Sequence, residues 1–369
     1  MTSEAGLTFE IHRSERPTPA ARRAELLADP GFGRVFTDHM VTIRWSKGEG
    51  WHDARLAPYA PIQLDPATMV LHYAQSIFEG FKAYHQADGG VKTFRPEANA
   101  QRFQRSAARL AMPELPERVF VEAADLLIGT DREWVPTEVD QSLYVRPFMF
   151  ATEVGLGVRP SSEFVFILLA SPSGAYFTRG MKPVSVWLSE EYVRAAPGGT
   201  GEAKCGGNYA ASLIAQQQAI EQGCDQVVWL DAVERRYVEE MGGMNVFFVY
   251  GTADDEVTLV TPELTGTLLP GVTRDSLLTL GRELGYKIEE RRVSTDEWRR
   301  DLETGRMTEA FACGTAAVIT PVGRVTSARD TFLVGDGEPG PITMGLRSTL
   351  LDIQHGRTPD IRGWMRTVC

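Results

Sequence analysis

The strongest constraint in the sequence is a glycine-rich turn at residues 198–209, in which five glycines surround a single lysine, Lys204. Glycine permits left-handed backbone angles and lets the main chain come close to a bound group. Beyond the turn, Gly223 is placed to end a helix, and apolar residues recur at helical spacing at Ala210, Leu213, Ile214 and Ile220. Lys204 is therefore expected at a strand-to-helix junction and not on a solvated face.

Three interpretations of Lys204 compete. A phosphate-binding loop of the Walker type needs glycine before the lysine and serine or threonine after it, but Ala203 and Cys205 occupy those positions. A second interpretation is a Schiff-base lysine, whose amine condenses with an aldehyde and is made nucleophilic by a lowered pKa. The third is an ordinary turn lysine. The chain has only six lysines against thirty-two arginines, and the local context leaves the last two interpretations open.

Length and charge limit the class of protein. A chain of 369 residues exceeds most single hydrophobic cores, so two domains are expected. The net charge of -11 argues against a nucleic-acid or anionic-membrane partner. The longest apolar run, Phe164 to Ala170, has seven residues, far fewer than the roughly 20 of a membrane span, and predicts a buried strand. Residues 1–23 contain no apolar signal segment, so a cytoplasmic location is expected.

The cysteine and histidine patterns favour neither a metal site nor a disulfide framework. The four cysteines show no C-x-x-C spacing and the six histidines are scattered, so no metal is expected. A nicotinamide oxidoreductase is excluded because no G-x-G-x-x-G fingerprint follows a strand. Gly155 and Gly157 continue into Val158, Arg159 and Pro160 and lack the third glycine.

A turn after the apolar run divides the chain. Residues 1–174 are expected to form an N-terminal domain, 175–184 a linker and 185–369 a C-terminal domain. Within the first domain, residues 1–30 are polar and are expected to form a mobile arm or a wrap over a partner subunit. The expected fold class is mixed α/β. Strands are expected at 36–43, 143–147, 164–170, 227–230 and 245–250, and helices at 97–112, after 208, from 272 to 285 and at 342–355.

Several charged and aromatic residues are candidate site residues. Arg146 lies between apolar neighbours on a predicted strand, and a buried arginine needs an anion, either a substrate carboxylate or an internal Asp or Glu. Arg102 lies on a predicted helix, where a solvated basic stripe is the default interpretation. Phe78 either lines a cavity or belongs to the core. The neighbours Glu239 and Glu240 are either solvated or hold a cationic ring nitrogen.

Two turns rich in small residues are suited to an anion. Val272 and Thr273 begin a predicted helix, whose N-terminus exposes unpaired N–H groups and a partial positive charge. The alternative for Thr273 is a simple N-cap. The turn at 313–317 follows an apolar strand and offers N–H groups and a hydroxyl. A lysine in a glycine turn, a carboxylate in a second turn and two phosphate-binding turns together match the requirements of pyridoxal phosphate.

The chain resembles the branched-chain amino-acid aminotransferases, which belong to the fold-type IV pyridoxal-phosphate enzymes. The resemblance covers nearly the whole chain from Phe36 onward and is carried by seven motifs in family order. They are FTDHM at 36–40, FEGFK at 78–82, YVRP at 144–147, GGNY at 206–209, EMGGMN at 240–245, LPGVT at 269–273 and CGTA at 313–316. The resemblance implies a two-domain, D-amino-acid-aminotransferase-like fold, with a smaller N-terminal α/β domain and a larger C-terminal pseudo-barrel domain.

The resemblance also implies roles for individual residues. Lys204 would bind the cofactor covalently and act as the catalytic acid/base, Tyr209 would contact its phenolic oxygen and Glu240 its pyridine nitrogen. The phosphate would be bound by Arg102, in place of the solvated stripe, and by Val272, Thr273, Gly314 and Thr315. The substrate α-carboxylate would contact Gly243 and Ala316. The side-chain pocket would consist of Phe36, Tyr73, Phe78, Tyr144, Arg146 and Tyr176, with Tyr73 supplied by the partner subunit.

The implied reaction is the reversible, pyridoxal-phosphate-dependent transfer of an amino group between L-leucine, L-isoleucine or L-valine and 2-oxoglutarate. Arg146 would meet the second carboxylate of glutamate, and a homodimer without nucleic-acid or membrane partners is implied. A redox switch found in some relatives is not expected, because Ala317 and Thr320 occupy its cysteine positions. The rivals are a D-amino-acid aminotransferase, an aminodeoxychorismate lyase and a non-catalytic protein of the same fold, although Lys204 and Glu240 argue against the last.

Overall fold

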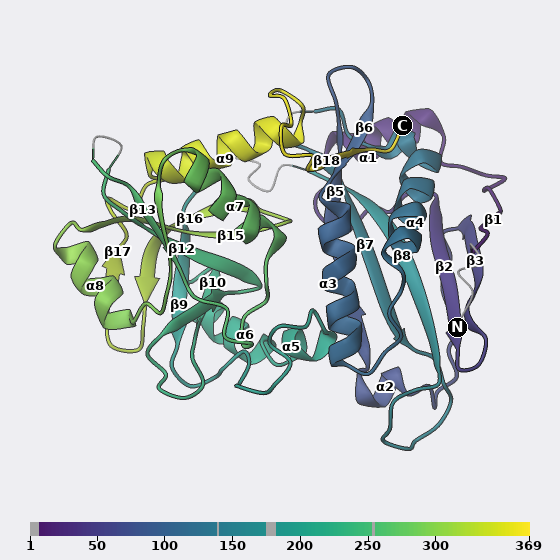
Figure 1. Cartoon of the computed structure of the whole chain (residues 1–369), viewed down its shortest axis with the longest axis horizontal. Helices are drawn as coiled ribbons and strands as arrows, with labels where there is room; N and C mark the ends of the chain where they lie inside the picture. The colour runs from purple at the N-terminus through teal and green to yellow at the C-terminus, as the bar shows by residue number, and fades with distance from the viewer. Residues whose placement is uncertain (1–6, 139, 175–181, 253–254) are drawn as a thin grey trace. The chain divides into compact units, whose positions relative to one another are not determined.

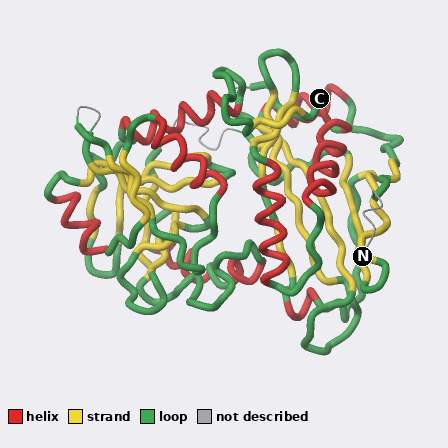
Figure 2. Tube along the Cα trace, in the orientation of Figure 1, coloured by secondary structure: helices red, strands yellow, loops and turns green. Residues whose placement is uncertain are grey.

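The computed structural model describes residues 7–138, 140–174, 182–252 and 255–369 (Figure 1). The chain forms two compact units. Unit 1 consists of Met1–Thr178, Ala203–Gly206 and Asp352–Cys369, and unit 2 of Arg179–Glu202 and Gly207–Leu351. Each unit combines strands and helices around its own sheet and hydrophobic core (Figure 2). The expected two-domain, mixed α/β fold is confirmed.

The division of the chain differs from the expected single cut after residue 174. Two later segments, Ala203–Gly206 and Asp352–Cys369, pack with unit 1 and make it the larger unit, whereas the sequence analysis placed both in a larger C-terminal domain. Strand pairing explains the difference, because Cys205 bridges to Ile77 and the last strand of the chain pairs within the first sheet. Residues 175–181 of the expected linker lie outside the described residues.

Unit 1 is built on a nine-stranded sheet with the order β1-β3-β2-β8-β7-β5-β6-β18, and β4 also pairs with β7. Neighbouring strands are antiparallel except for the parallel pair β1 and β3. The strands are β1 Glu10–Ile11, β2 His39–Ser46, β3 Gly50–Pro58, β4 Ser76–Phe78, β5 Phe81–His85, β6 Val91–Phe94, β7 Ser142–Ala151, β8 Glu163–Ser173 and β18 Met365–Thr367. The helices are α1 Ala20–Ala28, α2 Val70–Tyr73, α3 Pro96–Arg109 and α4 Glu117–Thr130, followed by a 3-10 turn at Arg132–Trp134.

Helices α3 and α4 cover one face of this sheet (Figure 1). Helix α3 begins with Pro96, whose fixed φ suits the first helical position, and its buried positions recur at helical spacing. Phe103 of α3 and Phe120 of α4 pack on Phe166 of β8, with ring centroids 5.7 and 6.0 Å apart. Each fully buried phenylalanine contributes about 1.5–3 kcal/mol to stability. This aromatic contact therefore fixes α3, which carries Arg102, on the sheet.

The described part of the expected N-terminal arm, residues 7–30, packs against the rest of unit 1 instead of extending from it. β1 pairs with β3, and both the N–H and the hydroxyl of Thr18 donate to Asp38, at 2.9 and 2.6 Å. The N–H of Ser14 donates to His39 Nε2 at 2.9 Å. Asp38 and His39 therefore anchor this segment, which corrects the expectation of a mobile arm.

Unit 2 contains a closed ring of six strands in the order β11-β10-β9-β16-β15-β12, in which β12 pairs back to β11. β13 and β14 extend from β12, and β17 pairs with β16. The strands are β9 Val184–Ser189, β10 Gln226–Leu230, β11 Val238–Met241, β12 Met244–Tyr250, β13 Thr258–Thr261, β14 Lys287–Glu290, β15 Met307–Gly314, β16 Val318–Thr326 and β17 Thr331–Leu333. The helices are α5 Gly206–Ala210, α6 Leu213–Glu221, α7 Val272–Glu283, α8 Thr295–Glu303 and α9 Pro341–Gln354. The ring confirms the expected pseudo-barrel.

The helix predicted after the lysine turn is interrupted and buries a different face. It forms as α5 and α6 with a turn at 211–212. The buried residues of α6 are Ala215 and Ala219, which pack in a small cluster with Trp229 of β10. Because the indole fills the space above the sheet, only small residues fit on this helix face. The three large apolar residues that were expected to face the core are 67%, 50% and 59% exposed, namely Leu213, Ile214 and Ile220.

Candidate active site

Lys204 is held by the main chain and helix α3 of unit 1. Its N–H donates to Ser106 Oγ at 3.0 Å, and its carbonyl accepts the N–H of Phe78 at 2.9 Å. The next residue, Cys205, forms an antiparallel bridge with Ile77 of β4. Because both polar groups of the Lys204 main chain are satisfied, the origin of its side chain is fixed. Helix α5 begins two residues later, as expected, but Lys204 follows a turn and not the expected strand.

The surroundings of the Lys204 amine favour its neutral form. Burial is the largest cause, and together with the positive charges of Arg102 and Arg146 it lowers the pKa of Lys204 to about 8, against the opposing effects of Glu79 and Tyr144. With this pKa, roughly a tenth of the amine is neutral at pH 7, against fewer than about one part in a thousand for an exposed lysine. Lys204 can therefore act as a nucleophile or a base near neutral pH.

A buried ion pair between Glu79 and Arg102 stands beside the lysine. Arg102 donates through Nε and Nη2 to the two carboxylate oxygens at 2.6 and 2.8 Å, and the side chains of Glu79 and Arg102 are only 0% and 5% exposed. This burial rules out the solvated stripe that local context suggested for Arg102. Sequence analysis missed Glu79, and the only available signal was a carboxylate placed between Phe78 and a glycine in an otherwise apolar segment.

Glu79→Gln is expected to lower the pKa of Lys204 below its value of about 8. The substitution removes the negative charge that opposes the shift and leaves the positive charge of Arg102 unbalanced. The rate at which the ligand-free protein forms a reducible Schiff base with an added aldehyde should then reach its plateau at a lower pH than in the wild type. Mass spectrometry of the reduced Lys204 peptide measures this rate.

The matched control for this prediction is Glu97→Gln. Glu97 lies in the first turn of α3 with its side chain 42% exposed, where it pairs with Arg366. In Glu97→Gln, the rate of Schiff-base formation should reach its plateau at the same pH as in the wild type. An equal or higher plateau pH in Glu79→Gln would show that Glu79 does not govern the charge of Lys204.

Arg146 is stacked between aromatic rings. Its guanidinium carbon lies 5.0 Å from the ring centroid of Phe78 and 5.2 Å from that of Tyr144, and Nη2 donates to the Tyr144 hydroxyl at 3.0 Å. The buried Nε has no hydrogen-bond partner, and among the described residues no Asp or Glu forms an ion pair with Arg146. The internal ion pair that the sequence left open is therefore not formed in the described part of the chain. A cation held this way retains donors for a carboxylate.

The other aromatic residues predicted for the side-chain pocket have different neighbours. Phe36 stacks on Tyr59 with ring centroids 5.2 Å apart. The ring that meets Tyr144 belongs to Phe32, edge-on at 5.0 Å, and sequence analysis missed this residue because it lies outside the 36–40 motif. Tyr73 lies on α2 and donates to the carbonyl of Leu156 at 2.5 Å, with 39% of its surface exposed. Tyr176 lies outside the described residues.

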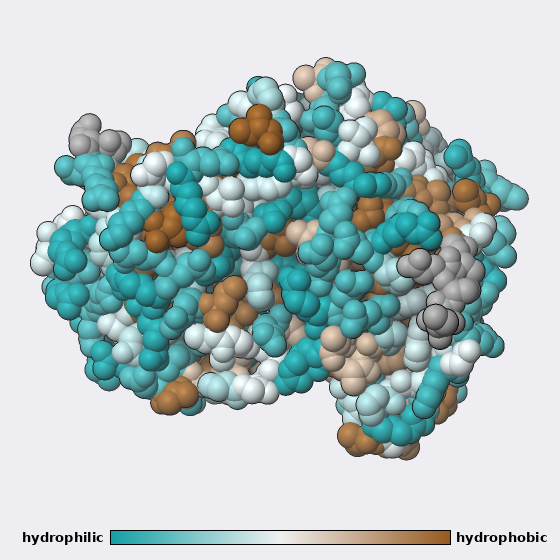
Figure 3. All heavy atoms as spheres, viewed as in Figure 1, coloured by the Kyte–Doolittle hydropathy of each residue, from teal (hydrophilic) through white to brown (hydrophobic). Residues whose placement is uncertain are grey.

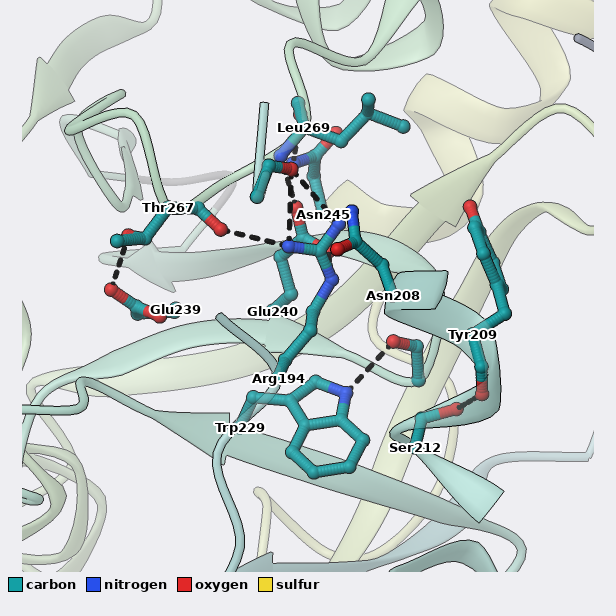
Figure 4. Close-up of polar contacts among 12 residues, drawn as sticks. Arg194, Asn208, Tyr209, Ser212, Trp229, Glu239, Glu240, Asn245, Thr267 and Leu269 are labelled. Carbon is teal, nitrogen blue, oxygen red and sulfur yellow. Dashed lines mark hydrogen bonds and ion pairs between the residues drawn. The ribbon is translucent and has the colours of Figure 1, made fainter. Parts of the chain in front are cut away.

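In unit 2, Glu240 is buried and held from two sides (Figure 4). Its side chain is 2% exposed, and Oε2 lies 2.8 Å from Nε of Arg194. Its Oε1 accepts the N–H of Leu269 at 2.5 Å. Side chains alternate along a strand, so the preceding residue, Glu239, projects to the other face of β11, where it accepts the Thr267 hydroxyl at 2.5 Å. Glu240 is therefore a fixed, buried anion and not a solvated carboxylate.

Two of the predicted turns are adjacent at one end of the barrel. The turn at 242–243 leads into β12, and the turn at 315–317 follows β15, so the pairing of Asn245 with Cys313 places the turns side by side. Three predicted site residues lie in these turns, namely Gly243, Thr315 and Ala316, and a fourth, Gly314, is the last residue of β15. Tyr209 belongs to the same group, because a Cβ on Gly243 would lie 3.3 Å from Cε1 of its ring.

The N-terminus of α7 is tied to this end of the barrel. Asn245 donates through Nδ2 to the carbonyl of Leu269 at 3.0 Å, just before the helix. The N-cap residue is Gly271, which has no side chain to occupy the first N–H groups, and Val272 and Thr273 follow as the first helical residues. Thr273 is therefore not the N-cap. The first N–H groups of α7 remain suited to an anion, as the sequence predicted.

Gly201, in the lysine turn, is needed because the main chain of Thr267 passes directly over it. A Cβ at this position would overlap the carbonyl group of Thr267. Gly201→Ala is expected to reduce the free energy of unfolding by about 1–3 kcal/mol, or to move the turn. At roughly 2–4 °C per kcal/mol for a unit of this size, thermal unfolding should show the difference.

Gly207→Ala is the matched control, because a Cβ on Gly207 would meet no atom within 4 Å. This glycine lies in the same motif and inside α5, where alanine has the higher helix propensity. The control should unfold at the wild-type temperature or above it. Equal melting temperatures for the two alanine variants would contradict the steric argument.

Comparison with known proteins decides the family. The family model described as amino-transferase class IV matches residues 76–325. A branched-chain-amino-acid aminotransferase of Mycolicibacterium smegmatis is 61% identical over 360 residues, which cover 97% of this chain and 98% of the relative. A branched-chain-amino-acid aminotransferase of Mycobacterium tuberculosis is 58% identical over 366 residues, which cover 99% of each chain. The chain belongs to the branched-chain-amino-acid aminotransferases.

The fold of this class IV aminotransferase agrees with a solved relative. The crystal structure of the T.th. branched-chain amino acid aminotransferase with pyridoxamine 5'-phosphate matches with a TM-score of 0.72 and 29% identity, and covers 89% of this chain and 98% of the other. Within the described ranges, the aminotransferase has no helix that is both long enough and apolar enough to cross a membrane. In the same ranges, there is no group of three or more His, Cys, Asp or Glu side chains that could hold a metal ion.

Proposed function

We propose that this aminotransferase uses pyridoxal phosphate to transfer the amino group reversibly between L-leucine, L-isoleucine or L-valine and 2-oxoglutarate. The observation that carries the proposal is the Lys204 amine, whose pKa is lowered to about 8 among buried charged and aromatic groups. The names of the relatives supply the substrate class, and the T.th. relative is described with pyridoxamine 5'-phosphate.

The residues present fit this cofactor. An aldehyde needs an amine that is partly neutral, which the lowered pKa of Lys204 provides. A protonated ring nitrogen needs a buried anion, and Glu240 is one that is held rigidly. A phosphate needs donors such as the open N-terminus of α7. We assign the cofactor to Lys204, Arg102, Tyr209, Glu240, Val272, Thr273, Gly314 and Thr315.

The chemistry that the bound cofactor supplies is an electron sink for the pair left when the substrate Cα–H bond breaks. Glu240 would hold the proton on the ring nitrogen that makes this sink effective. The neutral amine of Lys204 would take the proton from the substrate Cα and would return it to the carbon on the other side of the substrate nitrogen. Burial keeps the lysine amine available for this transfer near neutral pH, because solvation no longer favours its charged form.

Substrate selection is assigned to the aromatic residues and the arginine of unit 1. Phe78 and Tyr144 present apolar ring surface for a branched side chain, and Phe32, which packs on Tyr144, extends it. The stacked guanidinium of Arg146 provides donors for the second carboxylate of glutamate. Two substrates that differ by one charge can thus use one pocket. Gly243 and Ala316 are assigned to the α-carboxylate, and Phe36, Tyr73 and Tyr176 to the side-chain pocket.

A homodimer in the cytoplasm remains part of the proposal. Two groups of exposed apolar side chains support an interface, and Figure 3 shows brown surface at the end of unit 1 where α2 lies in Figure 1. The first group, near α2, is Leu71, Tyr73, Val154, Leu156 and Val158, and the second, on α6, is Leu213, Ile214 and Ile220. Clusters of exposed large apolar residues on a monomer mark interaction sites. Light scattering of the purified protein would report a monomer if this assignment fails.

The test of the proposed function is an absorption spectrum of the purified, cofactor-loaded protein before and after addition of L-leucine without any oxo acid. The proposal expects the cofactor band to convert to that of the amine form, and 2-oxoglutarate to restore it. Conversion by D-leucine instead would favour the D-amino-acid aminotransferase rival. A cofactor band that ignores both leucines would overturn the substrate assignment, and no band after addition of pyridoxal phosphate would overturn the whole proposal.

A further inference from the structure

Arg194 connects three segments of unit 2 through one buried guanidinium (Figure 4). It is 8% exposed and lies in the loop between β9 and the lysine turn. Its Nε pairs with Oε2 of Glu240 at 2.8 Å. Its Nη1 donates to the carbonyl of Thr267 at 2.8 Å, and both Nη atoms donate to the carbonyl of Gly201 at 3.2 Å. The lysine turn, β11 and the loop before α7 are thereby fixed by a single side chain.

The charge of Arg194 is matched to that of Glu240. The carboxylate is almost fully buried and is contacted by the guanidinium of Arg194 and by the main-chain N–H of Leu269. A carboxylate that loses its cation in such a place takes up a proton, because the uncharged form tolerates burial better. The guanidinium is planar and permanently charged, so it can supply the charge and fix the direction of the carboxylate at the same time.

We propose that Arg194 is a positioning residue that keeps Glu240 ionised and aimed, and that locks the lysine turn to the same carboxylate through Gly201. This inference rests on the proposed function, in which Glu240 contacts the ring nitrogen of the cofactor. Arg194 itself does not touch the substrate. It determines whether Glu240 is present as the anion that a protonated ring requires. Because Gly201 has no Cβ, its main chain can lie against that of Thr267, and both carbonyl groups can accept from the same guanidinium.

The test uses the cofactor-free protein first. Infrared spectra of Arg194→Met are compared with those of the double variant Arg194→Met/Glu240→Gln, and the difference isolates the Glu240 carboxyl group. We expect the C=O stretch of a protonated carboxylic acid in Arg194→Met near neutral pH, and its absence in the wild type, in the double variant and in Arg194→Lys, which keeps a cation. An ionised Glu240 in Arg194→Met would overturn the proposal.

Arg274→Met is the matched control for loss of a buried arginine. Arg274 is also almost fully buried in unit 2, and its Nη2 pairs with Glu290 at 2.7 Å. This variant should leave Glu240 ionised, and the same acid signal in it would overturn the assignment to Arg194. If Arg194→Met fails to fold, Arg194→Lys keeps the proposal testable, because a protonated Glu240 in that variant contradicts the role of the charge.

The second test measures the half-reaction rate of the cofactor-loaded enzyme. In the half-reaction with L-leucine, Arg194→Met should be slower than the wild type by at least about tenfold. Adding Glu240→Gln to this variant should slow the reaction little further, since both substitutions disrupt the same ion pair. Fully additive losses would contradict a shared role. If the infrared signal appears but Glu240→Gln alone reacts at the wild-type rate, the proposed function of Glu240 fails while the control of its charge by Arg194 stands.

Discussion

Replacing Lys204 with alanine should reduce the rate of the half-reaction with L-leucine by at least about a thousandfold, because both the covalent attachment of the cofactor and the acid/base group for the Cα proton are lost. The variant should still fold, since the main-chain bonds from Lys204 to Ser106 and Phe78 do not involve its side chain. Single-turnover absorption measures the rate. Borohydride reduction followed by mass spectrometry should find the cofactor on the Lys204 peptide of the wild type.

The matched control is Lys287→Ala, at an exposed lysine of β14 whose side chain is 57% exposed and pairs with Glu289. It should react as the wild type does. Added methylamine should restore part of the activity of Lys204→Ala, because a small amine can enter and move the proton. A Lys204→Ala rate within tenfold of the wild type would show that another group performs the proton transfer.

Glu240→Gln should keep the cofactor bound but lose roughly a hundredfold or more of the half-reaction rate, which is the scale of losing one electrostatic contact to developing charge. Glutamine has the shape of glutamate and its carbonyl can still accept the Leu269 N–H, but its NH2 group would face Nε of Arg194 and the ion pair would be lost. Glutamine cannot hold a positive charge on a ring nitrogen, so the electrons released at the substrate Cα are poorly accepted. Cofactor affinity is measured by titration, and the rate by stopped-flow absorption.

Glu239→Gln is the control for the Glu240 prediction. Glu239 is the preceding residue on the same strand, is also buried, and accepts the Thr267 hydroxyl through Oε1, while its Oε2 has no partner in the described residues. Its half-reaction rate should stay within roughly twofold of the wild type, because its carboxylate projects to the other face of β11. Near-normal rates in Glu240→Gln, or equal losses in both variants, would contradict a specific role of Glu240.

Local patterns in the sequence predicted those elements whose signal is contained in a few residues. The strands β10 and β12 and the helices α3, α7 and α9 form close to the expected positions, because apolar periodicity, Pro96 and the glycines act locally. The lysine turn was recognised for the same reason. The N-terminus of α7 was also predicted correctly, since the run from Leu269 to Thr273 contains its own helix start.

What the sequence did not predict depends on contacts between residues that are far apart in the chain. Arg102 pairs with Glu79, 23 residues away, and neither residue indicates the other by its neighbours. Helical spacing identified α6 but not its buried face, because Trp229 on another element leaves room only for alanine. The packing of residues 203–206 with unit 1 likewise depends on the bridge between Cys205 and Ile77.

Unit 1 is built from three separate segments of the chain, and this has a consequence for its folding during synthesis. Residues 203–206 and 352–369 belong to unit 1, and β18, which pairs with β6 at the edge of its sheet, is made only after the whole of unit 2. Unit 1 therefore cannot reach its final form while residues 352–369 are still to be translated. A fragment that ends at residue 174 would lack both Lys204 and this edge strand. We expect such a fragment to be less stable than unit 1 of the full chain, so cutting the gene in two should not yield two independent halves.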